Sequence, residues 1–203
     1  MKKSPGFLTV AAAALSFSFM SPKADKFVVV IDAGHGGKDH GATHEMATEK
    51  SITENVARKI KELNLDKEVE IHLTRDSDEF MELKSRTDLI NSVDADLVLS
   101  IHVQANKNVA AKGVEMYVGK DNPQKEKSLA FAQKLGVKLQ KNHGFNLRPT
   151  QEAPFFVLKN SKVPAVLVEL GFITNADDYR YLTSEAEQHK IAASIAEFVT
   201  EAK

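Results

Sequence analysis

The 203-residue chain contains no cysteine, and its formal net charge is only −1. Without cysteine neither disulfide bonds nor thiolate metal sites can form, so a metal ion would have to be held by His, Asp or Glu. The near-neutral charge gives no support for a nucleic-acid partner, which would need a basic face, and we expect no such partner. A chain of this length with 42% hydrophobic residues is expected to form one globular domain with a core of adequate size.

The apolar run over residues 7–20 falls short of the ~20 residues that a membrane-spanning helix needs. Two lysines precede it at residues 2–3, and Ser-Pro-Lys ends it at 21–23, which is the layout of a bacterial secretory signal. We therefore expect a signal peptide over residues 1–24 and a periplasmic or secreted protein. An uncleaved N-terminal anchor is the alternative, and without it no stable membrane insertion is expected. No cysteine follows the run, which excludes a lipoprotein.

Hydrophobic runs alternate with segments of helical spacing from residue 26 to residue 203, without a linker or a repeat. Such alternation, with three runs that are almost continuously apolar, predicts a single α/β domain with a mostly parallel central sheet. In sheets of this kind ligands bind outside the carboxyl ends of the strands. The expected strands cover residues 27–31, 69–73, 96–101, 114–118 and 165–168, and the expected helices lie within 52–63, 83–93, 129–139 and 191–199.

Three of the expected strands run into a residue suited to metal chemistry. His35 follows the first strand in a glycine-rich turn, His102 follows the third, and Glu169 follows the fifth. If these strands are parallel neighbours, the three side chains emerge at one edge of the sheet. Two imidazoles and a carboxylate in one crevice are typical of a zinc hydrolase.

A catalytic zinc ion usually has three protein ligands and one open position, so a further ligand has to be found. We prefer Glu49, because it begins the helix that carries Ile52 and Val56, and a residue at a helix start points back toward the sheet edge. The other candidates that follow His35 are Asp39, His40, His44 and Glu45.

Each of these residues, taken alone, has a simpler interpretation. His35 could be an ordinary turn residue, His102 a core histidine, and Glu49 a solvated carboxylate favoured by the helix dipole. The glycine-rich turn could bind phosphate, but residues 34–37 lack the Gly-Lys-Ser/Thr ending of a P-loop. Glu169 is harder to explain without a partner or a metal ion, since burying a lone carboxylate is costly. The four residues together favour the metal site.

Six separated segments of the chain form a pattern with a known counterpart. They are 31–37 (IDAGHGG), 49–50 (EK), 73–75 (LTR), 100–102 (SIH), 113–115 (GVE) and 163–172 (VPAVLVELGF). In content and in order they resemble the zinc-dependent N-acetylmuramoyl-L-alanine amidases of bacterial cell-wall turnover. The resemblance covers essentially all of residues 27–203.

The resemblance implies a mixed six-stranded sheet flanked by helices. It implies that zinc is bound by His35, Glu49 and His102, and that Glu169 is the catalytic carboxylate. The implied substrate is peptidoglycan or a muropeptide, cut at the amide between N-acetylmuramic acid and L-Ala. In such a reaction zinc lowers the pKa of water and polarises the carbonyl, while Glu169 moves the proton. We expect the protein to be a monomer.

Two departures from the family's pattern concern the substrate and the partners. The family commonly has Asn two positions after His102, whereas this chain has Gln104 there and Asn106 further along, so substrate contacts are assigned to Gln104 and Asn106. Some members carry a helical insertion after the fourth strand that occludes the zinc until an activator binds. Here only residues 119–125 precede the next helix, and we expect no obligatory activator.

Two other functions remain alternatives to the amidase. A zinc peptidase would use the same metal ligands, and only analysis of the products would separate the two activities. A non-catalytic wall-binding or activator protein of the same fold would be expected to have lost a ligand or the carboxylate. All four positions are intact in this sequence, which favours an enzyme.

Three further side chains are expected to be structural. Phe155 and Phe156 could line a groove, but we expect both in the core. Arg75 is expected to form a structural ion pair rather than to act in the site, and its candidate partners are Asp76, Asp78 and Asp88.

Overall fold

The computed structural model describes residues 26–203, and the expected signal peptide over residues 1–24 lies outside the described residues. The strands are β1 Phe27–Ala33, β2 Thr43–His44, β3 Ala47–Thr48, β4 Val69–Leu73, β5 Leu97–Gln104, β6 Glu115–Gly119, β7 Gln151–Ala153 and β8 Ala165–Phe172. The helices are α1 Glu49–Leu63, α2 Leu83–Ser92, α3 Lys125–His143, α4 Phe156–Asn160, α5 Ala176–Thr183 and α6 Glu185–Ala202. Among these helices none combines the length and the apolar composition that crossing a membrane requires.

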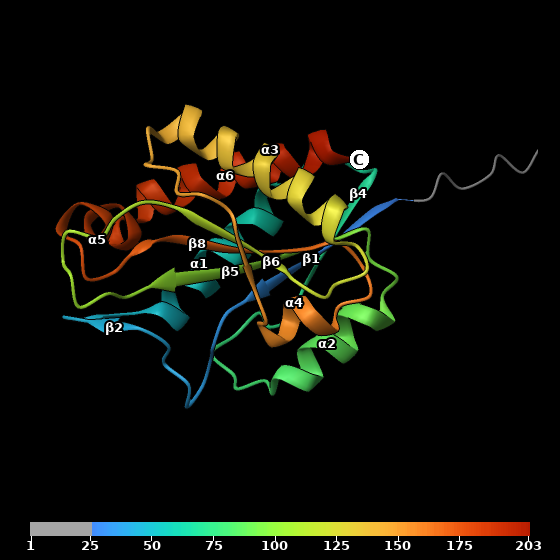
Figure 1. Ribbon diagram of the computed structural model, residues 1–203, viewed down its shortest axis with the longest axis horizontal. Helices are drawn as coiled ribbons and strands as arrows, with labels where there is room; N and C mark the ends of the chain where they lie inside the picture. The colour runs from blue at the N-terminus through green and yellow to red at the C-terminus, as the bar shows by residue number, and fades with distance from the viewer. Residues whose placement is uncertain (1–25) are drawn as a thin grey trace, which may run out of the picture.

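The central sheet has six strands in the order β4-β1-β5-β8-β6-β7 (Figure 1). β4, β1, β5 and β8 run parallel to one another, whereas β6 runs antiparallel to β8 and β7 is parallel to β6. β2 and β3 form a separate small hairpin that leads into α1. The mixed, mostly parallel six-stranded sheet expected from the sequence and the resemblance is therefore confirmed.

The two faces of the sheet are covered unequally. Side chains such as Val29 and Ile31 point into the larger core, which α1, α3 and α6 close. The other face packs a smaller core against α2 and α4, around Val30, Val98 and Leu167. These apolar residues lie in the amino-terminal half of their strands. The carboxyl-terminal half of the strands, on the same face of the sheet, is therefore free to carry polar side chains.

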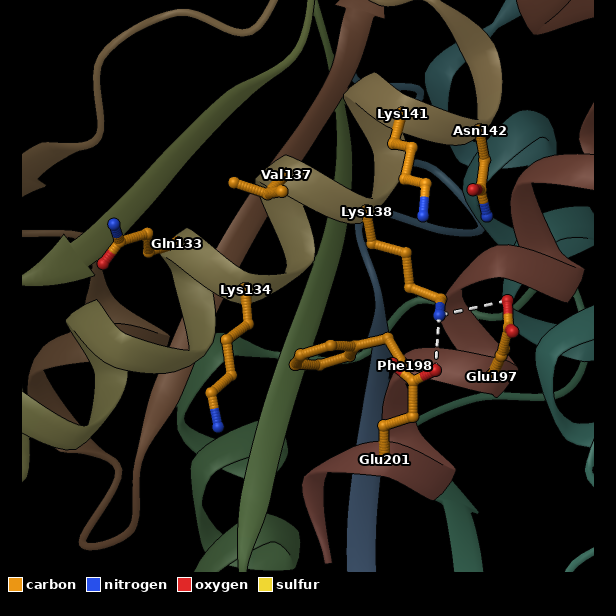
Figure 2. Close-up of a pocket in the computed structure, with 9 residues that line it drawn as sticks. All are labelled: Gln133, Lys134, Val137, Lys138, Lys141, Asn142, Glu197, Phe198 and Glu201. Carbon is orange, nitrogen blue, oxygen red and sulfur yellow. Dashed lines mark hydrogen bonds and ion pairs between the residues drawn. The ribbon is translucent and has the colours of Figure 1, made fainter.

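A hollow of about 660 Å³ lies between α3 and α6, against the larger core and away from that polar half-face. Figure 2 shows Lys138 of α3 pointing at two carboxylates of α6. Its ammonium group lies 3.1 Å from Glu197 and 2.8 Å from Glu201. The charge of Lys138 is thus already balanced by these ion pairs. The residues that line the hollow form no set of catalytic groups, despite its size.

Two strands extend further than the sequence pattern indicates. We expected β5 and β8 to end before His102 and Glu169, but the ladder continues and pairs these two residues directly. Both side chains therefore stand on the open half-face instead of at a strand end. The hydrophobic pattern did not predict β2, β3, β7, α4 and α5, because elements this short do not show a readable periodicity.

Candidate metal centre

His35 lies in the turn that follows β1, with a left-handed backbone (φ 61°). The chain can approach β5 closely here because residue 34 is glycine: a Cβ on Gly34 would lie 2.5 Å from the ring of His102. Gly41 likewise allows the chain to pass close to Glu49, since its φ is +63° and a Cβ there would clash with the Glu49 carboxylate. The glycines thus bring the two imidazoles within 5.2 Å of each other, centroid to centroid.

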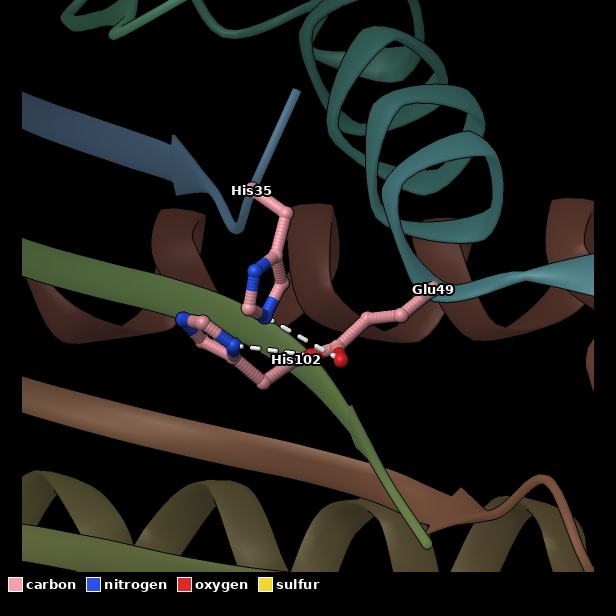
Figure 3. A group of neighbouring side chains, drawn as sticks. All are labelled: His35, Glu49 and His102. Atoms are coloured by element: carbon pink, nitrogen blue, oxygen red, sulfur yellow. Dashed lines mark hydrogen bonds and ion pairs between the residues drawn. The ribbon is translucent and has the colours of Figure 1, made fainter. Parts of the chain in front are cut away.

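Glu49 is the first residue of α1, as expected, and its buried carboxylate is held from four sides. Oε1 lies 2.9 Å from His102 Nδ1 and accepts a hydrogen bond from Val103 N at 3.0 Å. Oε2 lies 3.1 Å from His35 Nε2 and accepts a hydrogen bond from Ala42 N at 2.7 Å. Figure 3 shows both imidazoles pointing at this carboxylate.

The pKa values of these three groups follow from their mutual contacts. Burial alone would raise the pKa of Glu49, but the two imidazoles beside it hold the pKa well below its usual range. Burial would lower the pKa of His35, but Glu49 and Asp39 raise it to about 9. The pKa of His102 is likewise raised, against the effect of burial, by Glu49 and Glu169. Without a metal ion His35 is therefore a cationic partner of Glu49 at neutral pH, and the pKa of His102 is shifted in the same direction.

The cluster has the dimensions of a metal site. One donor atom from each of His35, Glu49 and His102 lies within 4.8 Å of the others. In tetrahedral zinc sites donors at 2.0–2.2 Å from the ion are separated by roughly 3.3 Å. Here His102 Nδ1 lies 2.9 Å from Glu49 Oε1, and His35 Nε2 lies 3.1 Å from the other oxygen, Oε2. Asp39 lies 2.8 Å from Nδ1 of His35, which is how outer carboxylates orient metal-binding imidazoles. The residues present therefore fit a zinc ion.

Glu169 stands beside this cluster and has a different environment. It is buried, and its Oε2 has no hydrogen-bond partner among the residues that the structure describes. Burial is the main reason why the pKa of Glu169 is raised to about 7, with Glu49 and Glu115 adding to the effect and His102 opposing it. A buried carboxyl group with a free oxygen and a pKa near neutrality is suited to proton transfer.

These groups open into a cavity of about 470 Å³ over the polar half-face of the sheet. Gln104 lines it, whereas Asn106 is exposed in the following loop, where its Oδ1 accepts a hydrogen bond from Asn108 N. The expectation that Phe155 and Phe156 belong to the core was wrong: they are 40% and 41% exposed and line the cavity. The two residues sit where β7 leads into α4, above the smaller core, which leaves their rings uncovered.

Two arginines hold the turn that carries His35. Arg75 donates to the carbonyl oxygens of Ala33, Gly34 and Lys50, and its ion-pair partner is Glu54 at 2.8 Å. A structural ion pair of Arg75 is therefore confirmed, but its expected aspartate partners were wrong, because the side chain turns inward under α1.

Arg86 of α2 holds the same turn from the other side. It donates to Ala33 O and His35 O, and it pairs with the buried Asp32 at 2.7 Å. Thr74 and Ser100 also donate to the Asp32 carboxylate. No local sequence pattern indicates this network, although a carboxylate at the end of an apolar strand already requires a buried partner.

Replacing Arg86 by methionine is expected to lower the free energy of unfolding by about 3–5 kcal/mol, because Asp32 would remain buried without its cation. Urea-induced unfolding of the metal-free protein measures this change. Arg58→Met on the exposed side of α1 is the matched control and should change the value by less than about 0.5 kcal/mol. A loss below about 1 kcal/mol for Arg86→Met would mean that Thr74 and Ser100 suffice to hold Asp32.

The family model described as N-acetylmuramoyl-L-alanine amidase matches residues 29–201. The chain belongs to this amidase family. Among curated relatives, the probable cell wall amidase LytH of Staphylococcus saprophyticus is 36% identical over 87% of this chain and 58% of its own length. The N-acetylmuramoyl-L-alanine amidase AmiA of Escherichia coli is 30% identical over 88% of this chain and 78% of its own length. The chain thus spans little more than half of the first of these relatives.

Solved amidase structures match the fold of this amidase-family chain. The catalytic domain of CwlV from Bacillus (Paenibacillus) polymyxa gives a TM-score of 0.79 at 34% identity, covering 86% of this chain and 96% of that one. The CwlD amidase of Clostridioides difficile, solved in complex with the GerS lipoprotein, gives 0.80 at 28% identity, covering 87% and 98%. The described residues therefore correspond to an amidase catalytic domain.

Proposed function

We propose that this domain is a zinc-dependent N-acetylmuramoyl-L-alanine amidase that hydrolyses the amide between N-acetylmuramic acid and L-Ala in peptidoglycan or muropeptides. The observation that carries the proposal is the convergence of His35, Glu49 and His102 beside a buried, partly unpaired Glu169 in one cavity. Membership of the amidase family supports the choice of bond. We further propose that the protein acts after export, in the periplasm or outside the cell, and as a monomer.

His35, Glu49 and His102 would hold the zinc ion through one donor atom each. The chemistry that zinc supplies when bound is polarisation of the scissile carbonyl and a lowered pKa of water. With two neutral imidazoles and one carboxylate the ligand set leaves the site with a net positive charge, which favours the negative charge that develops on the carbonyl oxygen. Asp39 keeps the His35 ring in position.

Glu169 would carry the proton. In its ionised form the carboxylate takes a proton from the attacking water, and it then delivers a proton to the nitrogen of the leaving L-Ala. A pKa of about 7 lets one carboxyl group serve both steps near neutral pH. Its unpaired Oε2 is free for this exchange because no described residue donates to it.

No activator is proposed to be necessary, because the connection between β6 and α3 is short. β6 ends at Gly119 and α3 begins at Lys125, which leaves no length for a helix that could cover the cavity. Gln104, which lines the cavity, is proposed to contact substrate, whereas Asn106 is proposed to do so only through the loop that it shapes.

The test is digestion of purified peptidoglycan by the zinc-loaded full chain, without any added protein. Release of glycan and of stem peptides with a free L-Ala amino group is the expected result. Release of other amino groups would identify a peptidase and would contradict the proposal. If digestion requires an added wall extract, the proposed independence of an activator is wrong while the bond specificity stands.

Metal uptake by the metal-free protein is expected to release about one proton from His35 at neutral pH, and a further fraction of a proton from His102. The reason is that His35 and His102 have raised pKa values in the metal-free protein and must lose their protons to become ligands. The measurement is zinc titration calorimetry in buffers of different ionisation enthalpy. The released fraction should fall above pH 9, where His35 is already neutral. A pH-independent zinc affinity would contradict the assignment of the two histidines as ligands.

A further inference from the structure

The β6 and β7 side of the cavity carries a polar group of residues that the proposed reaction does not use. The sheet register places Glu115 opposite Glu169, Tyr117 opposite Leu167, and Gln151 opposite Tyr117. Residues directly opposite each other share a face of the sheet, so these side chains stand on the same half-face as Glu169. This polar group lies next to the reacting centre.

Glu115 is the centre of that group, and its carboxylate is buried. It accepts hydrogen bonds from Arg148 Nε at 2.8 Å, Gln151 Nε2 at 2.9 Å and Tyr117 OH at 3.0 Å. Because three donors, one of them cationic, stabilise the ionised form, Glu115 is poorly suited to move a proton. Its contacts instead fix the side chains around it, above all the arginine.

Arg148 is held firmly but keeps part of its guanidinium free. Its backbone N donates to Val114 O, its Nε donates to Glu115, and its Cζ lies 5.3 Å from the ring centroid of Phe172. Among the described residues none accepts a hydrogen bond or forms an ion pair with Nη1 or Nη2, and the side chain is 38% exposed. Phe172 is paired in register with Gln104, which lines the cavity. The guanidinium is therefore fixed next to Glu115, which the sheet register places opposite Glu169 at the edge of the site.

We propose that Arg148 binds a carboxylate of the stem peptide and so selects the peptide part of the substrate. The inference rests on the proposed amidase function. The free edge of a guanidinium group carries two parallel N–H groups, which can form a bidentate pair of hydrogen bonds with a carboxylate. The carboxyl group of N-acetylmuramic acid is consumed in the scissile amide, so a free carboxylate near that bond has to belong to the stem peptide.

Two consequences follow from this placement. The edge of the cavity formed by β6 and β7 receives the peptide, and the glycan extends toward the opposite side, where α2 lies. Glu115 is a positioning residue. Its carboxylate forms an ion pair with Arg148 and holds the guanidinium group in place, but it touches no substrate. Selectivity for a charged stem peptide thus depends on both Arg148 and Glu115, although only Arg148 contacts the substrate.

The test uses two kinds of muramoyl dipeptide, which differ only in whether the residue after L-Ala carries one free carboxylate or is fully amidated. Both positional isomers of the monocarboxylate are assayed with the zinc-loaded full chain. Arg148→Gln is expected to lower kcat/KM for one monocarboxylate by about 10- to 100-fold, mainly through KM. The amidated substrate should change by less than about threefold. Arg148→Lys should keep part of the preference, because it keeps the charge but loses the fork.

Arg58→Gln, an exposed arginine of α1, is the matched control and should leave both substrates unaffected. Glu115→Gln should reduce the preference for the monocarboxylate as well, since Arg148 loses its anchor. An equal loss on charged and amidated substrates in Arg148→Gln would overturn the inference and give Arg148 a purely structural role. If the wild type cleaves neither muramoyl amide, it is the proposed function that fails, whatever Arg148 does.

Discussion

Glu169→Gln is expected to lower kcat for muramoyl-amide hydrolysis by about 10²- to 10⁴-fold while the protein keeps its zinc ion. Glutamine has nearly the shape of glutamate but cannot accept the proton of water. The zinc ion stays because the three proposed ligands hold one another independently of Glu169: each oxygen of Glu49 contacts one histidine and one backbone N–H. Single-turnover kinetics and metal analysis of the same preparation measure the two effects.

Glu70→Gln is a suitable control, because Glu70 is a half-buried glutamate of β4, at the edge of the sheet, whose carboxylate pairs with Lys26 and lies outside the site. It should retain wild-type kcat. Loss of zinc in Glu169→Gln would contradict the proposed division of roles and would make Glu169 a ligand. Unchanged kcat with bound zinc would mean that another group moves the proton.

The same substitution has a consequence for stability in the metal-free protein. The pKa of Glu169 is about 7 in the fold instead of an ordinary 4.5, so the folded state binds this proton more tightly than the unfolded chain. The free energy of unfolding of the wild type should therefore decrease by about 3 kcal/mol as the pH rises from below 4.5 to above 7. Glu169→Gln should lack this decrease, which thermal unfolding of both proteins at a series of pH values would reveal.

Glu49→Gln is expected to abolish stable zinc binding and, with it, activity. The amide cannot provide a charged donor, and its NH₂ group would face an imidazole or a backbone N–H that now contacts an oxygen. The loss of affinity should exceed the roughly 10- to 100-fold that outer-shell partners contribute. Competition with a chelator of known zinc affinity measures it.

Glu45→Gln is the matched control for Glu49, since Glu45 is a nearby exposed glutamate that the sequence alone also allowed as a ligand. It should leave the zinc affinity unchanged. If Glu45→Gln and not Glu49→Gln released the metal ion, the ligand assignment from helix geometry would be wrong.

The sequence predicts those parts of the fold that depend on local patterns of residues along the chain. The apolar runs predict the central strands, and the position of Glu49 at a helix start is correct because helical spacing begins there. The orientation of β6, by contrast, depends on a long connection that periodicity does not describe.

Other features depend on residues that are distant in the sequence. Arg75 pairs with Glu54 on α1 instead of a neighbouring aspartate, and Phe155 remains 40% exposed because only one side of its ring packs against Tyr117 of β6. Arg86 reaches a carboxylate 54 positions away. Such choices are made by the packing of the whole domain, so no local pattern could have indicated them.

Arg75 and Arg86 hold the His35 turn by donating hydrogen bonds to its main-chain carbonyl oxygens. Transplanting the site into another protein would therefore require these contacts as well. Copying residues 31–37 into another α/β protein would transfer the imidazole but not the two guanidinium groups that donate hydrogen bonds to the carbonyl oxygens of its turn. A working graft has to include both arginines together with their carboxylates, Glu54 and Asp32. The smallest portable unit is therefore a set of contacts from four elements, and a contiguous peptide is insufficient.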